Sequence, residues 1–224
     1  MPQAGIHAMV GMATRKWTGA REWLLLGAVL GSVTPDLDNL AVAVATLTGG
    51  ATEGLHRTFT HSVFFIAAVV AVFYAIGALK KDARWTNLGY GLGLGILLHI
   101  LVDLVLWFNN VHIFWPLNGE VGLWKEYPAG LEWLREFNEQ AAEFLFFGVY
   151  LWALGSWARK FGTDGDFAGK LRFWTWFEFV LFAIFFILLL TGKIFAIISG
   201  GLYLVSILMV FFVTIRMRKT LEAA

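Results

Sequence analysis

Apolar stretches of about 20 residues, the length a helix needs to cross the hydrocarbon core of a membrane, recur along this chain. Hydropathy places them at residues 22–48, 62–79, 88–108, 142–158, 173–191 and 194–215. Only 15% of the residues are charged, against roughly 25% in soluble domains. We therefore expect residues 1–224 to form a single all-α, polytopic transmembrane domain, which excludes a secreted or cytosolic enzyme.

The first apolar stretch is interrupted. Pro35 lies near its middle beside Asp36 and Asp38, and a short apolar segment, residues 6–13, precedes it. Proline breaks the hydrogen-bond pattern of a helix, and a broken helix inside a membrane must face protein or water. Residues 4–48 are therefore predicted to form a broken or re-entrant helical hairpin that unwinds at Pro35. About five further transmembrane helices follow it, at the usual length of a span.

Lysine and arginine are distributed unevenly over the loops. Thirteen of the 17 lie in loops that the predicted spans place on one side of the membrane. These are Arg15, Lys16, Arg21, Lys80, Lys81, Arg84, Arg159, Lys160, Lys170, Arg172, Arg216, Arg218 and Lys219. Basic loops stay in the cytoplasm, so the C-terminus of this cytoplasmic-membrane protein is predicted to be cytoplasmic, with the 109–141 loop on the extracytoplasmic side. A net charge of +1 without a basic face argues against a nucleic acid partner.

Ionisable residues occur where hydrocarbon is expected. An aspartate at the centre of a spanning helix costs about 2.5–3.5 kcal/mol, so such residues indicate function. In chain order the set is His7, Asp36, Asp38, His56, Arg57, His61, His99 and Asp103. The chain has no cysteine, which excludes thiolate metal sites and cysteine nucleophiles.

Spacing predicts how these residues meet. His99 and Asp103 are four apart and lie on one face of their helix, where both can reach one ion. Asp36 and Asp38 are two apart and would diverge in an intact helix, so their convergence requires the unwinding at Pro35. The proline and the two carboxylates are thus expected to belong to one feature.

The segment from His56 to His61 is predicted to form the mouth of the same site. The two histidines are five apart and can share a site only if residues 56–60 are irregular. Thr60 is expected to cap the helix that starts at His61. Arg57 would present a fixed cation whose fork suits phosphate or carboxylate.

Charge balance favours a metal centre. Three carboxylates in a low-dielectric region exceed what Arg57 can neutralise, and imidazole with carboxylate is a ligand set for zinc, or for manganese when carboxylates predominate. The candidate ligands are His7, Asp36, Asp38, His61, His99 and Asp103. Six ligands are too many for one zinc with an open position, so two ions are predicted, zinc first and manganese second. Candidate catalytic residues are His56, Arg57 and Asp38.

These motifs resemble the YdjM-like inner-membrane family, described as predicted metal-dependent hydrolases. The resemblance rests on Gly5-Ile6-His7 and on residues 31–38, 56–62, 99–103 and 114–117, so it covers roughly residues 4–117. The spans within 142–215 carry no motif that matches. The resemblance implies a membrane-embedded metal-dependent hydrolase.

A site at hydrocarbon depth is reached most readily by an amphiphile, which suggests a hydrolase of an ester or phosphoester in lipid metabolism, with the site facing the extracytoplasmic side. The tails of such a lipid-like substrate would lie among Phe64, Phe65, Phe108 and Phe114. Two alternatives stay open at this point. Broken helices with carboxylates also suit a divalent-cation or proton transporter, and the metal of an accessory membrane protein can be purely structural.

Overall fold

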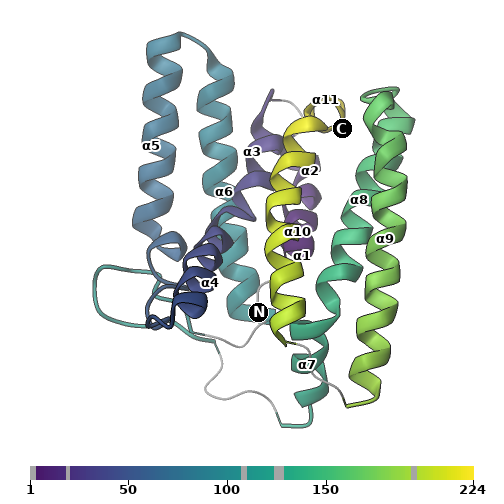
Figure 1. Cartoon of the computed structure of the whole chain (residues 1–224). Coiled ribbons are helices and arrows are strands. Elements are labelled where there is room, and N and C mark those ends of the chain that lie inside the picture. The colour runs from purple at the N-terminus through teal and green to yellow at the C-terminus, as the bar shows by residue number, and fades with distance from the viewer. Residues whose placement is uncertain (1–3, 19–20, 107–109, 124–128, 193–195) are drawn as a thin grey trace. The chain divides into compact units, whose positions relative to one another are not determined.

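The computed structural model describes residues 4–18, 21–106, 110–123, 129–192 and 196–224 (Figure 1). In these ranges the regular elements are all helices, apart from one isolated bridge between Val111 and Val121. The α-helices are α1 (Ala4–Ala13), α2 (Arg15–Thr18), α3 (Leu24–Gly31), α4 (Asn39–Thr48), α5 (Val63–Lys80), α6 (Ala83–Leu106), α7 (Glu132–Gln140), α8 (Ala142–Phe161), α9 (Gly165–Leu190), α10 (Ala196–Arg216) and α11 (Arg218–Glu222). Two 3-10 helices, η1 (Thr34–Asp38) and η2 (Phe59–His61), complete the set. The predicted all-α class is confirmed.

Among the described residues, up to five candidate membrane spans follow the interrupted N-terminal stretch. Helices α5, α6, α9 and α10 are each long and apolar enough to cross a membrane, and α7 and α8 form a further candidate span bent by 57°. The predicted spans overlap these helices, although α6 and α9 begin at Ala83 and Gly165, before the predicted starts at 88 and 173. The predicted spans 88–108 and 194–215 each reach beyond the described residues. The chain is therefore a polytopic helical membrane protein.

The first apolar stretch is broken where the sequence predicts. Helix α3 has eight residues, about 12 Å of rise, which falls short of a hydrocarbon core about 30 Å thick. The backbone then tightens into η1, with Pro35 in its first turn, and α4 resumes at Asn39. Because proline lacks an amide hydrogen, it is tolerated at the start of a new helix and not within a continuing one.

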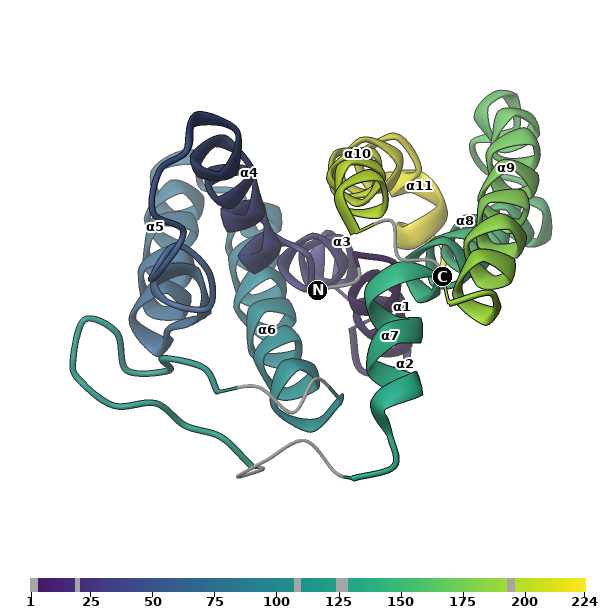
Figure 2. The ribbon, with the colours of Figure 1, turned by 60° about the horizontal axis from the view of Figure 1, so that its bottom comes forward.

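Backbone contacts divide the chain into two compact units. Residues 10–127 form the N-terminal unit, and residues 128–224 together with 1–9 form the C-terminal unit. Within the N-terminal unit, Figures 1 and 2 both show α6 lying between α3 and α5, and it packs against each of them. Within the C-terminal unit, α8 packs along α9.

A seam of glycines joins α3 to α6. Gly27 and Gly31 on α3 face Gly91 and Gly95 on α6, and a Cβ atom on any of the four would overlap backbone atoms of the opposite helix. Gly91-x-x-x-Gly95 is thus a small-residue motif that permits close helix approach, with α3 as the partner. This approach sets the end of α3 directly against the part of α6 that carries His99.

Candidate metal centre

The N-terminal unit brings three of the predicted motifs into one cluster. η1 supplies two carboxylates, the segment leading into α5 supplies two imidazoles and a guanidinium, and α6 supplies an imidazole and a carboxylate. The residues are Asp36, Asp38, His56, Arg57, His61, His99 and Asp103. These residues lie far apart in the sequence, so the fold alone unites them.

Four of these side chains form an inner group that is fully buried: Asp36, His61, His99 and Asp103. The Nε2 atoms of His61 and His99 lie 3.1 Å apart. His99 Nε2 is 3.7 Å from Asp36 Oδ1, and His61 Nε2 is 3.7 Å from Asp103 Oδ2. His99 Nε2 and Asp103 Oδ2 lie 3.9 Å apart on one face of α6, as the four-residue spacing predicts.

The backbone of α3 fixes the tautomer of His99. Its Nδ1 atom lies 2.8 Å from the carbonyl oxygen of Ser32, just after the last residue of α3. A carbonyl only accepts hydrogen bonds, so Nδ1 carries the proton and Nε2 carries a lone pair. Metal-binding histidines are oriented in this manner, with the second ring nitrogen donating to a carbonyl or carboxylate.

A hydroxyl fixes the tautomer of His61 in the same sense. Thr60 Oγ1 donates to Asp38 Oδ2 at 2.9 Å and lies 3.0 Å from His61 Nδ1. Because the hydroxyl has one proton, it must accept from His61 Nδ1–H, which leaves the lone pair of His61 on Nε2.

Two imidazole lone pairs therefore face each other beside two buried carboxylates. Without a positive charge between them this arrangement is repulsive. Two nitrogen ligands of one tetrahedral zinc lie about 3.3 Å apart, given Zn–N bonds of about 2.0–2.1 Å. The 3.1–3.9 Å spacings of the inner group are close to that value, so these buried groups could hold a divalent ion.

An outer group adjoins the inner one through His61. His56 Nδ1 lies 2.7 Å from Asp38 Oδ1, and the rings of His56 and His61 have centroids 5.3 Å apart. Residues 53–58 are irregular, whereas residues 59–61 form the short turn η2, so the predicted irregularity of 56–60 holds only as far as residue 58 and no α-helix separates the two histidines. Asp38, His56 and His61 form a second set able to hold an ion. Burial lowers the pKa of His56 below its ordinary value, which favours the neutral ring.

Arg57 connects the two groups. Its Nε donates to Asp103 Oδ2 at 3.1 Å, and its backbone amide donates to Asp38 Oδ2 at 3.3 Å. The residue has a φ of 60°, a conformation costly for a side chain other than glycine, and the amide of His112 donates to its carbonyl. Among the described residues Nη2 of Arg57 is buried without a hydrogen-bond partner. One edge of the guanidinium is thus available to an anion.

A family model described as YdjM inner membrane protein matches residues 3–222, nearly the whole chain. The chain belongs to the YdjM inner membrane protein family. The family match and the apolar helices identify an integral protein of the cytoplasmic membrane. The match also reaches past residue 117, where the motifs end. Comparisons with curated proteins and with solved structures returned no match.

His7 of this YdjM-family chain is fully buried on α1. It belongs to the C-terminal unit, whereas the cluster belongs to the N-terminal unit. A role of His7 as a metal ligand therefore stays a prediction.

The predicted cap at Thr60 is wrong. Helix α5 starts at Val63, and its cap is Ser62, whose hydroxyl accepts from the amide of Phe65 at 3.1 Å. Ser62 has the extended backbone that a cap requires, whereas Thr60 lies within the turn of η2. The hydroxyl of Thr60 orients Asp38 and His61 instead.

Asp36 and Asp38 enter the cluster at different ends of His61. Asp38 lies 3.4 Å from Nδ1, while Asp36 belongs to the inner group on the Nε2 side. Asn39, which the sequence analysis did not select, donates to both carboxylates, at 3.4 Å and 3.3 Å. Its position directly after Asp-Leu-Asp is the signal that could have identified it. The carbonyl of Ser32 has no such signal, because every residue type carries one.

Proposed function

We propose that this protein is a metal-dependent hydrolase, embedded in the membrane, that cleaves an ester or phosphoester bond of a lipid-like substrate. One observation carries the proposal. A buried site suited to a divalent ion adjoins a histidine and an arginine, each with one buried nitrogen that has no hydrogen-bond partner among the described residues: Nε2 of His56 and Nη2 of Arg57.

The inner group is the proposed first metal site, with zinc as the first choice and manganese as the second. When bound, such an ion supplies Lewis acidity, which lowers the pKa of water and stabilises a leaving oxygen. The sequence predicts a second ion, which would use the outer group. That ion would replace the hydrogen bond between His56 and Asp38 or the one between His61 and Thr60.

His56 is the proposed general base. The carboxylate of Asp38 accepts from Nδ1–H of His56, so the lone pair of the ring lies on Nε2. A carboxylate that holds one ring nitrogen fixes the orientation of the ring and stabilises the imidazolium that forms when Nε2 takes a proton. Asp38 thus has a positioning role, and it would become a ligand if the outer group held an ion.

Arg57 is the proposed anion contact. Asp103 fixes the guanidinium through Nε and leaves Nη2 to donate to a phosphate or carboxylate of the substrate. Charge that develops on that group during hydrolysis would be stabilised without any movement of the arginine.

The surroundings of the cluster suit an amphiphile. The inner group is fully buried, whereas His56 and Arg57 are 20% and 17% exposed, so substrate would arrive from their side. The ring of Phe59 packs against the rings of Phe65 and Trp115, with centroids 4.9 Å and 5.3 Å apart. Phe64 and Phe114, two of the expected contacts of the lipid tails, are each 48% exposed, and Phe108 lies outside the described residues.

Turnover of lipid esters tests the proposal. Purified protein in vesicles of mixed phospholipids and isoprenoid phosphates should release hydrolysed product, and His61→Ala and Asp103→Ala should abolish release. His112→Ala is the matched control, because the side chain of His112 pairs with Glu120 at the surface at 3.1 Å, and alanine keeps the backbone amide that donates to Arg57.

Three other outcomes would reject the hydrolase. Unchanged turnover in variants that have lost their metal would separate the ion from hydrolysis. Divalent-ion or proton flux into proteoliposomes that both variants abolish, with no hydrolysis by the wild type, would favour a transporter, which the interrupted α3–η1–α4 segment also suits. Tight, non-exchanging metal without either activity would indicate a structural site.

A further inference from the structure

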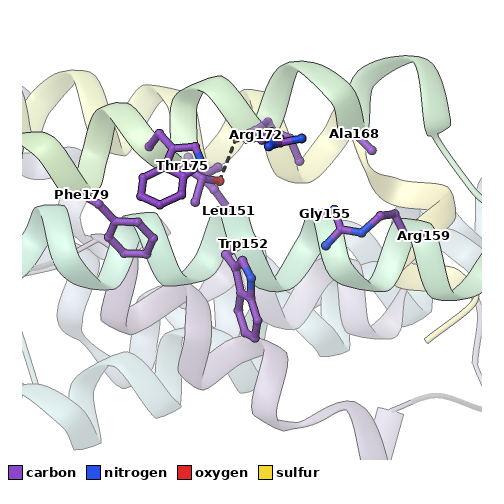
Figure 3. Close-up of a pocket in the computed structure, with 10 residues that line it drawn as sticks. Leu151, Trp152, Gly155, Arg159, Ala168, Arg172, Thr175 and Phe179 are labelled. Carbon is purple, nitrogen blue, oxygen red and sulfur yellow. Dashed lines mark hydrogen bonds between the residues drawn. The ribbon is translucent and has the colours of Figure 1, made fainter.

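The C-terminal unit contains a cavity of about 510 Å³ between α8 and α9, built from residues that take no part in the metal cluster. Figure 3 shows Arg159 of α8 and Arg172 of α9 toward the same end of the cavity, with Trp152 and Phe179 farther along the two helices. Leu151 and Trp176 also line it. The cavity is therefore basic at one end and apolar along the remainder.

The polar groups of the lining leave the positive charge uncompensated. The described lining contains no acidic side chain. Arg159 donates to the hydroxyl of Ser156 at 3.1 Å, a neutral partner. The hydroxyl of Thr175 donates to the carbonyl of Leu171 at 2.7 Å, so its proton is already used within the protein and needs no acceptor on a bound molecule. An anion that entered the cavity would therefore meet two guanidinium groups.

The length of the cavity corresponds to one leaflet. Its lining runs from Leu151 to Arg159 on α8 and from Ala168 to Phe179 on α9. At 1.5 Å per residue these segments rise about 12 Å and about 16 Å. Half of a hydrocarbon core is about 15 Å. An occupant with its charge at the arginines would therefore extend close to the middle of the bilayer.

Open space adjoins the arginines. A second cavity of about 430 Å³ includes Arg159 and Arg172 and extends to the turn between the helices. It includes Gly162, Gly165 and Gly169, and a Cβ atom on any of these would meet nothing within 4 Å. This space can accept a headgroup beyond the phosphate.

We propose that this cavity binds one anionic glycerophospholipid from the leaflet at the α8–α9 turn. Its phosphate would lie between Arg159 and Arg172, and an acyl chain would lie along Trp152, Trp176 and Phe179. Basic pockets between transmembrane helices bind anionic headgroups, and tryptophan favours the interface between headgroups and hydrocarbon. This leaflet is the one predicted to be cytoplasmic. The site is independent of the proposed hydrolase, because the two share no residue.

Native mass spectrometry of the full chain, released from detergent with defined lipids, tests the site. Phosphatidylglycerol should bind the wild type with higher occupancy than phosphatidylethanolamine. The double variant Arg159→Gln and Arg172→Gln should weaken the binding of phosphatidylglycerol about 30-fold. Each basic residue near an anionic headgroup contributes a little more than fivefold, or about 1 kcal/mol, to the affinity. Gly155→Leu should weaken it without any change of charge, because residue 155 lines the cavity and its Cβ meets only Arg159, at 3.7 Å.

The double variant Lys160→Gln and Lys170→Gln is the matched control. It removes the same charge from positions one and two residues away on the same helices, at exposed residues that do not line the cavity. Equal loss in the two double variants would overturn the site in favour of diffuse attraction to a basic surface. Equal binding of the two lipids, or binding of glycerol phosphate as strong as that of phosphatidylglycerol, would also overturn it.

Discussion

His61 has different neighbours at its two ring nitrogens, which is why both halves of the cluster depend on it. Nδ1 faces the Thr60 hydroxyl and Asp38, and Nε2 faces His99 and Asp103. Removing the ring would abolish both groups at once. Its orientation can be weakened more selectively at Thr60, which touches the ring without belonging to either ligand set.

Thr60→Val tests this positioning role. Valine keeps the shape of the side chain but cannot hold Nδ1–H of His61, so the lone pair on Nε2 is no longer fixed toward the inner group. Loss of such an orienting partner typically costs about 10- to 100-fold in metal affinity. We expect a decrease in zinc affinity of that size, measured by competition with a chelating dye.

Thr58→Val is the control for that substitution. The hydroxyl of Thr58 donates to the carbonyl of Gly54 at 2.9 Å, and valine keeps the Thr58 backbone carbonyl that accepts from the amide of His61. Its zinc affinity should equal that of the wild type. Equal affinities in all three proteins would mean that Thr60 does not orient the ligand.

Arg57→Gln separates binding of the ion from catalysis. Arg57 donates to the cluster and cannot be a ligand, so the variant should keep its metal content. Loss of a donor to the developing negative charge typically lowers the rate by about 100- to 1,000-fold. Elemental analysis measures the retained metal, and the vesicle turnover assay measures the loss of rate. A variant that loses its metal would show that Arg57 acts only by supporting Asp103.

The ionisable residues of the site could be selected from the sequence, but the groups that orient them through hydrogen bonds could not. The imidazoles, the carboxylates and Arg57 are visible because charge is rare in a membrane span. The carbonyl of Ser32 carries no residue-type signal, and the choice between Thr60 and Ser62 as cap depends on backbone angles that neighbouring residues do not fix.

At the scale of elements, the contact between α3 and α6 positions the site. The carbonyl of Ser32, at the end of α3, reaches His99 of α6 only because glycines let the two backbones approach. A Cβ atom at Gly95 would lie against the backbone of Ala28, Gly31 and Ser32, so α3 must shift if that position is filled. The Ser32 carbonyl would then move away from His99.

Gly95→Ala should therefore lower the thermal midpoint of unfolding and weaken zinc binding together. Overpacking of this kind costs about 1–3 kcal/mol. Gly169→Ala in α9 is the control, because its Cβ meets nothing within 4 Å and alanine is the better helix former by about 0.5–1 kcal/mol. Thermal unfolding in detergent and dye competition measure the two effects. An unchanged midpoint and affinity in Gly95→Ala would contradict the role of the seam.

The elements themselves were largely predictable. The lengths of the apolar stretches predicted the five later candidate spans, and Pro35 predicted the break in the first stretch. Both predictions follow from the cost of unpaired backbone groups in hydrocarbon. The 57° bend between α7 and α8 was not predictable, since hydropathy starts the span at residue 142 and the charged residues of α7 place that helix in the preceding loop.

At the scale of the whole molecule, the basic loops predict the orientation in the membrane. The absence of cysteine from the sequence makes this directly testable by single substitutions. Thr52→Cys lies in the exposed loop before η2, and Glu222→Cys lies in the exposed end of α11. In intact cells an impermeant maleimide should label the first and not the second, and permeabilisation should expose both. The reverse pattern would place the metal cluster on the cytoplasmic side.

The central claim is that the inner group holds a divalent ion, and the number of ions per purified chain tests it most directly. Protein purified without chelators and offered zinc or manganese should retain about one ion per chain or more, as a closely spaced nitrogen and oxygen ligand set requires. His99→Gln and Asp36→Asn should each lower retention to background, while His112→Gln should match the wild type. Wild-type protein without a retained ion, or inner-group variants that keep the full complement, would contradict the account.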